Sequence, residues 1–298
     1  MPAASPPVAT AAVRGVLAGY RFGAGDLTTT LGPGDFWRAT FTPDGPGTLH
    51  LDWSTGELRA AAWGPGGDWL LAGVPALTGA FDEGHMFTDA HPHIVAAQRD
   101  HPHLRFGASG TLYHELLPTI LAQRITAGEA IAQWHRLVRR LGEPAPGPHP
   151  QLRLPPSPQA LLDQPRWWFH PLGIEGKRVT PLHQVARHAA RLFEWAQLPP
   201  SEAAAKLHLL TGIGQWTTGS VLGTALGDPD AVAVGDFHLK NIVTHALTGR
   251  PRGTDDEMLA LLAPYTGQRG RVVKLLLAAG HRAPAFGPRQ RILPMRRW

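Results

Sequence analysis

The residue pattern changes near Gly110, and this change constrains the fold more than any other feature of the sequence. Before it, apolar and polar residues alternate in "TLHLDW" and "ELRAAAW", which flank the turn sequence "STG", so a β-hairpin is expected. After it, apolar residues recur at spacings of three and four, as in amphipathic helices. We therefore predict an α+β chain, with an antiparallel sheet domain over residues 13–110 and an all-helical domain over residues 111–280.

Local signals place several helix starts and one interruption within the helical part. Thr126 and Glu129 have the spacing of a capping box. The other expected capping residues are Ser157, Ser201, Asp236 and Asp255. Residues 143–158 contain seven prolines, which prevent helix formation, so we expect an extended linker between two helical lobes there.

Composition narrows the chemistry that the chain can perform. Its 298 residues include no cysteine, which excludes disulfides, a cysteine nucleophile and a cysteine-ligated iron–sulfur cluster. No long apolar run and no secretory leader pattern are present, so a cytoplasmic protein without a membrane span is expected. The formal net charge of +5 fits a polyanionic partner.

The two ends of the chain are expected to lie outside the folded domains. Residues 1–12 are predicted to form a disordered N-terminal tail. Residues 281–298 contain five arginines and no acidic residue. This basic tail fits either a nucleic-acid contact or a solvated terminus.

A glycine-rich turn is expected to join two helices, over residues 201–210 and 215–226. In "TGIG", residues 211–214, the glycines permit positive φ and a close backbone approach to a ligand. The second helix would leave the amides of Gln215, Trp216 and Thr217 without intrahelical acceptors, and such amides bind phosphate. A helical hairpin that needs glycine merely to turn explains the same residues.

Asp236 lies 20 residues after Trp216, in "VGDFHLK" at the start of a further predicted helix. At an N-cap, amide donors and the helix dipole favour an ionised carboxylate. An ordinary capping role is one interpretation of this residue. The other is a catalytic carboxylate held beside a bound phosphate backbone.

Four stretches together resemble the HhH-GPD superfamily of DNA glycosylases, in its DNA-3-methyladenine glycosylase II branch. They are "LLTGIGQWTTG", "VGDFHLK", "LAQRIT" and "HPLGIEGKR". The likeness covers residues 110–280, and the N-terminal part resembles, more loosely, the TATA-binding-protein-like domain of that branch. The resemblance implies a two-lobed helical domain with a DNA-binding cleft between the lobes. It also implies a monomer that flips a damaged base out of double-stranded DNA.

The resemblance assigns roles to named residues. Asp236 becomes the catalytic carboxylate, and Trp216 stands where strand-cleaving relatives carry a Schiff-base lysine, which implies a monofunctional enzyme. The implied reaction is hydrolysis of the N-glycosidic bond of an alkylated purine, of the 3-methyladenine or 7-methylguanine type. The implied base pocket contains Trp216, Tyr265, Ser220, Gln123 and Trp168.

The implied DNA contacts are Thr211, Gly212, Ile213, Gly214, Gln215, Thr217, Arg124, Lys240 and Arg269. No cofactor is implied, but in the family a monovalent or alkaline-earth cation binds hairpin carbonyls, which here are those of His208, Leu210 and Ile213. Three positions depart from the family pattern. Ser220 replaces a pocket tyrosine, Arg124 replaces the apolar plug of the gap left by the flipped base, and Thr211 replaces a hairpin proline.

Two other functions remain open. A glycosylase for deaminated or oxidised purines would use the same scaffold, and Ser220 fits that alternative. A non-catalytic DNA-damage-binding protein on the same fold is the second alternative, against which Asp236 argues. The histidines of two "HPH" triplets, at 91–93 and 101–103, lack a supporting metal-ligand spacing, and loop positions are expected for them.

Overall fold

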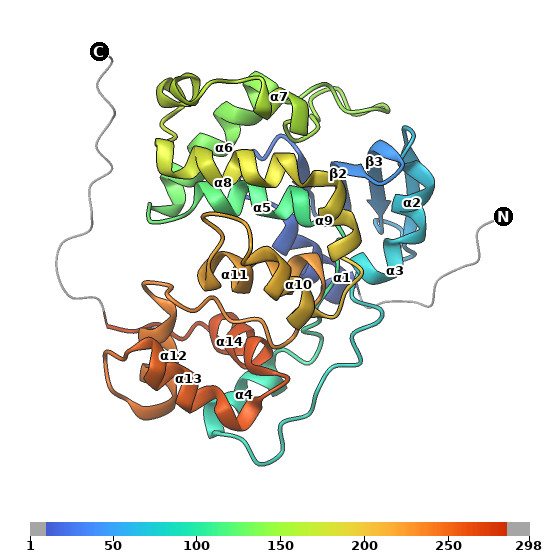
Figure 1. The fold of residues 1–298 in the computed structure, drawn as a ribbon. Coiled ribbons are helices and arrows are strands. Elements are labelled where there is room, and N and C mark those ends of the chain that lie inside the picture. The colour runs from blue at the N-terminus through green and yellow to red at the C-terminus, as the bar shows by residue number, and fades with distance from the viewer. Residues whose placement is uncertain (1–9, 285–298) are drawn as a thin grey trace.

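The computed structural model describes residues 10–284, and Figure 1 shows their arrangement. The strands are β1 (Thr29–Leu31), β2 (Asp35–Thr42), β3 (Gly45–Asp52) and β4 (Arg59–Trp63). The helices before Gly110 are α1 (Thr10–Leu17), η1 (Ala18–Tyr20), α2 (Gly67–Ala72), α3 (Val74–Leu77) and α4 (Pro92–Asp100). The helices that follow are α5 (Leu112–Leu121), α6 (Ala127–Leu141), α7 (Pro158–Leu162), η2 (Arg166–Leu172), α8 (Gly176–Arg187), α9 (Ala189–Trp195), α10 (Pro200–Leu207), α11 (Gln215–Ala225), α12 (Leu239–Thr248), α13 (Asp255–Leu262), η3 (Ala263–Tyr265) and α14 (Arg269–Ala278).

The predicted α+β fold is confirmed. The strands form one antiparallel sheet in the order β1-β2-β3-β4, and the described chain after it is mostly helical. The predicted hairpin is the pair β3 and β4, in which Asp52 pairs with Arg59.

Each face of the sheet packs against a different part of the chain. Phe36, Leu49 and Leu51 join one apolar cluster with residues of α1, α2 and α3. Ala39 belongs to another cluster, with Leu152 and Leu154. The alternation of side chains along β2 separates the two sets.

The proline-rich segment 143–158 is not a linker between two lobes, contrary to the prediction. Its Leu152 and Leu154 are buried against the sheet, and the amide of Arg153 donates to the carbonyl of Leu27 at 2.7 Å. The helices on either side of it contribute to the same hydrophobic core. Proline prevents helix formation but does not prevent an extended chain from packing. Leu152 and Leu154, at alternate positions, were the sequence feature that indicated a buried extended segment.

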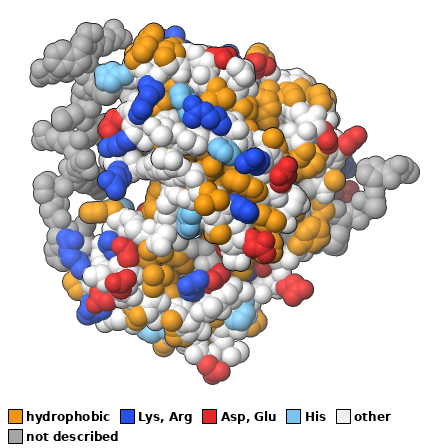
Figure 2. Space-filling model, in the orientation of Figure 1, with side chains coloured by type: hydrophobic (Ala, Val, Ile, Leu, Met, Phe, Trp, Pro, Cys, Tyr) orange, Lys and Arg blue, Asp and Glu red, His pale blue; other side chains and the backbone are white. Residues whose placement is uncertain are grey.

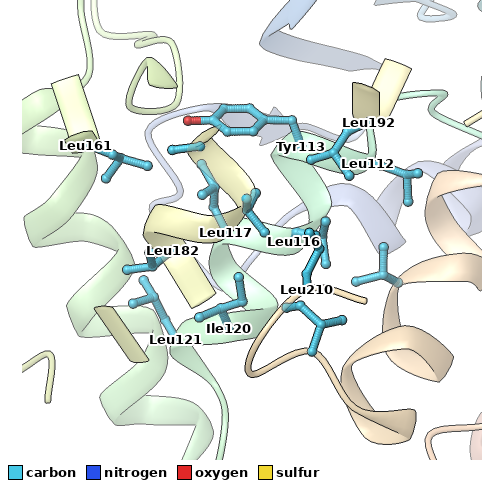
Figure 3. Close-up of a cluster of buried hydrophobic side chains, with 14 of the residues drawn as sticks. Leu112, Tyr113, Leu116, Leu117, Ile120, Leu121, Leu161, Leu182, Leu192 and Leu210 are labelled. Carbon is cyan, nitrogen blue, oxygen red and sulfur yellow. The ribbon is translucent and has the colours of Figure 1, made fainter. Parts of the chain in front are cut away.

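Helices α5 to α11 share what we call the large helical core. α5 runs through its middle, and most of its residues are buried, as expected for a helix that is apolar on nearly all sides. Figure 3 shows the apolar side chains of α5 among Leu161, Leu182, Leu192 and Leu210 from four other segments. This packing fixes α5 firmly against α11.

Helices α4, α12, α13 and α14 form a second cluster, the small helical core. α4 packs against α14, as Figure 1 shows, although α4 precedes Gly110. The boundary expected at residue 110 therefore does not separate the two packing units.

The cap predictions are partly correct. Thr126 and Glu129 form the capping box of α6, and Ser157 caps α7. Thr254 rather than Asp255 caps α13, and Ser201 lies inside α10, which begins after Pro199.

The predicted tails fall largely outside the described residues. α1 begins at Thr10, within the tail expected at 1–12, and the basic tail is described only as far as Pro284. Within residues 10–284, no helix has the length and apolar character needed to cross a bilayer.

Candidate functional site

The predicted hairpin joins α10 to α11 through an exposed turn. Gly212 has φ of +89°, and a Cβ on it would lie 3.0 Å from the ring of Pro181, so glycine is required there. Ile213 is 5% exposed and anchors the turn in the large helical core. The exposed residues of the turn are Thr211, Gly212, Gly214 and Gln215.

The N-terminus of α11 opens toward solvent. Gly214 precedes the helix and has no side chain to cap it. The amide of Thr218 donates to the carbonyl of Gly214 at 3.0 Å. The three amides before it, those of Gln215, Trp216 and Thr217, therefore have no intrahelical acceptor, which makes the turn suitable for an anion.

Gln123, a predicted pocket residue, instead braces this hairpin. Its Nε2 donates to the carbonyl of Gly212 and to the hydroxyl of Thr217, both at 2.9 Å. The guanidinium of Arg178 donates to the carbonyl of Gln123 at 3.2 Å. Thr217 is 2% exposed, so its side chain is part of the brace.

Replacing Gln123 with leucine should loosen the hairpin. The variant keeps the size of the side chain but leaves a carbonyl and a hydroxyl without their donor, so we expect the free energy of unfolding to fall by about 1–2 kcal/mol. Urea denaturation and hydrogen exchange of the amides at 215–218 would measure the effect. The exposed Gln197→Leu serves as the control. Equal exchange in both variants would contradict the brace.

Asp236 lies next to the hairpin and accepts hydrogen bonds from three N–H groups. Its Oδ1 accepts from the amides of His238 at 2.8 Å and Leu239 at 2.9 Å, and its Oδ2 accepts from the indole N–H of Trp216 at 3.3 Å. Two residues that are 20 positions apart are thus in contact. α12 begins at Leu239 rather than directly after Asp236. The carboxylate therefore accepts from the first amide of α12 and from the amide of His238 just before it.

Asp255 fixes the backbone beside Asp236. Its Oδ1 accepts from the amide of Gly235 at 2.9 Å, and its Oδ2 pairs with the ammonium of Lys240 at 3.0 Å. Burial opposes the shift, but the Gly235 amide and the Lys240 ammonium lower the pKa of Asp255. Lys240, a predicted DNA contact, is therefore paired with a carboxylate of its own chain.

A cavity of about 250 Å³ lies beside Trp216, between α5 and α11. Its α5 wall consists of Glu115, Pro118, Thr119 and Ala122, one face of that helix. Its α11 wall consists of Trp216, Ser220 and Thr224, at a spacing of four. α5 also contributes His114, and the remaining lining residues are Gly19, Tyr20, Arg21, Phe22, Asp26 and Trp134.

The segment 19–26 forms a wall of this cavity that sequence reasoning missed. Asp26 holds it in place, because its carboxylate accepts from the amide of Phe22 at 2.9 Å and from the indole N–H of Trp134 at 3.1 Å. The segment precedes the sheet, and we assigned it to the sheet domain. In the sequence, the only indication of this role was the pair of aromatic residues, Tyr20 and Phe22, among glycines.

A buried ion pair lies at the cavity. Arg38 of β2 donates to the carboxylate of Glu115 at 2.6 Å, and their side chains are 2% and 10% exposed. Burial raises the pKa of Glu115, and the Arg38 guanidinium opposes that rise. Burial, with help from Arg38, lowers the pKa of the neighbouring His114 well below its usual value, which favours a neutral ring.

Solved structures match this arrangement, whereas no protein-family model and no curated protein sequence matches the chain. The 3-methyladenine DNA-glycosylase from Archaeoglobus fulgidus superposes with a TM-score of 0.72 at 15% identity, over 89% of this chain and 94% of that one. The chain has the fold of the helix-hairpin-helix DNA glycosylases. The 8-oxoguanine glycosylase/lyase of Clostridium acetobutylicum, bound to double-stranded DNA with cytosine opposite 8-oxoguanine, gives 0.63 at 12% identity over 85% and 87%.

Two predicted pocket residues lie elsewhere in this glycosylase fold. Tyr265 packs against the small helical core, where its hydroxyl accepts from the amide of His91 at 3.3 Å. Trp168 packs edge-to-face against Phe169 at the large helical core. Neither lines the cavity.

The predicted DNA-contacting arginines differ in their availability. Arg269 donates through its Nε to Asp230 at 2.9 Å, so it is already paired. Arg124 is exposed, and within residues 10–284 it is the non-glycine residue with positive φ, at +58°.

One of the hairpin carbonyls expected to bind a cation already accepts a hydrogen bond from the chain. The carbonyl of Leu210 accepts from the amide of Ile213 at 3.0 Å, and a cation at the carbonyls of His208, Leu210 and Ile213 stays a prediction. In the described part of the chain, no group of three or more His, Asp or Glu residues could hold a metal ion.

His91 accepts from the amide of His93 at the start of α4, so the first HPH triplet begins a helix rather than lying in a loop.

Proposed function

We propose that the chain is a DNA glycosylase that hydrolyses the N-glycosidic bond of alkylated purines in double-stranded DNA. The observation that carries the proposal is the contact between Trp216 and Asp236, at the hairpin and beside the cavity. The A. fulgidus protein with the same fold is a 3-methyladenine glycosylase, which supports this substrate class. In such a reaction the base leaves the duplex and enters the cavity.

Charge explains the role of Asp236. Breaking the N-glycosidic bond builds positive charge on the sugar, and a carboxylate beside that sugar stabilises the charge and orients the attacking water. The amides at the start of α11 would hold a phosphate of the same strand. The aromatic residues Phe22 and Trp216 at the cavity suit an alkylated purine, because electron-rich rings attract a positively charged base.

The surface supports a polyanionic partner. Figure 2 shows Lys and Arg side chains on both the upper and the lower part of the pictured face, with more of them on the upper part, where Figure 1 places α5, α6, α7 and α8. Exposed arginines of these helices include Arg139, Arg140 and Arg187. Such charges attract DNA without reading its sequence.

The proposed enzyme is monofunctional, because an indole cannot form an imine with the abasic sugar and Trp216 occupies the position of the lysine in strand-cleaving relatives. We expect free base to appear and the DNA strand to stay intact. Chromatography of bases released from methylated genomic DNA tests the hydrolysis. Borohydride trapping on abasic DNA tests the lyase step. A trapped covalent adduct would contradict the monofunctional reaction, and release of no base from methylated DNA would contradict the proposed activity.

A glycosylase for oxidised or deaminated purines is the second candidate. Ser220 favours it, because this small residue donates its hydroxyl to the carbonyl of Trp216 at 2.7 Å and leaves room in the α11 wall. A structural neighbour acts on 8-oxoguanine. A panel of duplexes with single defined lesions separates the two candidates.

The wider architecture follows from the same proposal. We take the N-terminal sheet as the TATA-binding-protein-like domain and the two helical cores as lobes on either side of the DNA. The proposed enzyme works as a cytoplasmic monomer and needs no cofactor, with at most a structural cation at the hairpin.

A further inference from the structure

The cavity extends along α5 and α11 well beyond Trp216. The two helices run antiparallel, because Gln123 at the end of α5 contacts Thr217 at the start of α11, while the amide of Ser109 donates to the carbonyl of Thr224 at the opposite end. Trp216 therefore lies at one end of the cavity and Glu115 toward the other. Glu115 and Ala122 are about 10 Å apart along the helix, since each residue adds 1.5 Å. This length accommodates a base whose sugar remains near Asp236.

Small side chains leave the space between these ends open. Ser220 turns its hydroxyl toward the carbonyl of Trp216 on its own helix. Thr119 does the same on α5, where its hydroxyl donates to the carbonyl of Glu115 at 2.8 Å. Neither hydroxyl proton is available to a ligand. Both hydroxyl oxygens can still accept a hydrogen bond, but neither carries a charge.

Two other polar residues of the wall are already engaged. Asp26 accepts from the amide and hydroxyl of Thr28, both at 2.9 Å, in addition to its bonds with Phe22 and Trp134. The ring nitrogens of His114 contact the hydroxyls of Thr28 and Thr40, each at 3.1 Å. These contacts fix the wall and occupy its polar atoms.

Glu115 and Arg21 are the other charged residues of the lining, and of the two only Glu115 is buried. Arg38 donates to one carboxylate oxygen at 2.6 Å, and the hydroxyl of Ser109 also donates to this carboxylate. Arg38 itself is fixed by the carbonyl of Tyr20 at 3.1 Å and by the hydroxyl of Thr111 at 3.4 Å, and it does not line the cavity. Burial raises the pKa of Glu115, and the Arg38 guanidinium and the Ser109 hydroxyl oppose that rise by stabilising the ionised form. We take this ionised form, in which the carboxylate only accepts hydrogen bonds.

We propose that Glu115 selects the base, by accepting hydrogen bonds from the Watson–Crick edge of a guanine-type lesion. This inference rests on the proposed glycosylase function. Guanine and its 7-alkylated form present two donors on that edge, the ring N1–H and the exocyclic amine. Adenine presents one donor and the N1 acceptor, which a carboxylate repels. The cavity therefore prefers 7-methylguanine to 3-methyladenine.

The test uses the variant Glu115→Gln. Its amide oxygen can still accept from Arg38, so its NH₂ group turns to the cavity and opposes the donors of guanine. Methylated genomic DNA supplies both lesions in one reaction, and chromatography gives the rate for each base. We expect the ratio of the 7-methylguanine release rate to the 3-methyladenine release rate to fall at least about 10-fold. A buried donor left without an acceptor disfavours the guanine lesion by about that factor.

A matched control is available in the pair Asp82–Arg271, which is buried to a similar degree but does not line the cavity. Asp82→Asn should leave the rate ratio unchanged. If Glu115→Gln proves too unstable by circular dichroism melting, Glu115→Asp withdraws the carboxylate from the cavity while keeping its charge, and the same fall is expected. An unchanged ratio in a folded Glu115 variant would overturn the inference.

Binding of free bases separates this inference from the proposed activity. Quenching of tryptophan fluorescence by 7-methylguanine and by 3-methyladenine reports occupancy directly, because Trp134 and Trp216 line the cavity. Selective binding of 7-methylguanine that is lost in Glu115→Gln, in a protein that releases no base from DNA, would refute the glycosylase and retain the selective cavity. If the wild-type protein releases bases from DNA but binds 7-methylguanine and 3-methyladenine with equal affinity, the glycosylase is retained and the selective role of Glu115 is refuted.

Discussion

Replacing Asp236 with asparagine is expected to abolish base release while leaving the fold in place. The amide oxygen of asparagine can still accept from His238 and Leu239, so the start of α12 is kept. The negative charge beside the sugar is lost. Loss of one such electrostatic contact typically slows an enzyme by about 10²–10³-fold. Single-turnover release of bases from methylated DNA would measure it.

The exposed Asp256→Asn is the matched control, since it removes one negative charge from the described surface and takes no part in the hydrogen bonds of Asp236. It should retain the wild-type rate. Affinity for abasic DNA should survive in Asp236→Asn, because the hairpin is unchanged. A wild-type rate in Asp236→Asn would refute the catalytic assignment.

Replacing Gly219 with alanine should lower both stability and activity. Gly219 is in the middle of α11, and a Cβ there would overlap the backbone carbonyl of Val232. The segment after Val232 carries Asp236, whose amide donates to the carbonyl of Ala233 at 3.1 Å. Overpacking costs about 1–3 kcal/mol of unfolding free energy. A displacement of about 1 Å in a reacting group costs about 10²-fold in rate.

Gly223→Ala is the matched control on the same helix, one turn later. The nearest atom to its added Cβ lies at 3.7 Å, an ordinary contact. Alanine stabilises a helix by up to about 1 kcal/mol relative to glycine. The two variants should therefore shift the urea midpoint in opposite directions, and only Gly219→Ala should slow base release. Identical behaviour of the two would show that α11 does not position Asp236.

Local residue patterns were sufficient to predict the hairpin, and the resemblance to the glycosylase superfamily placed Asp236 beside it. Glycine and a capping aspartate have local signatures, because each satisfies a demand of the backbone within a few residues. The hydrogen bond between Trp216 and Asp236 follows from two such local features that the fold brings together.

The walls of the cavity were harder to predict, because they depend on tertiary packing. Tyr20 and Phe22 reach α5 and α11 through the interactions of Asp26 with Trp134, over 100 positions away in the sequence. Tyr265 and Gln123 do not line this cavity, for the same reason. One is held by the small helical core, and the other is turned to the hairpin.

The cavity takes its walls from residues as far apart as Gly19 and Thr224, and this has a consequence for synthesis of the chain. At a translation rate of about 5–20 residues per second, α11 follows the segment 19–26 by roughly 10–40 s. Throughout that interval the growing chain lacks the α11 wall and the carboxylate of Asp236. A nascent or prematurely terminated chain can therefore contain Tyr20 and Phe22 but cannot hold a base between them and α11. The site becomes competent only when the chain is nearly finished.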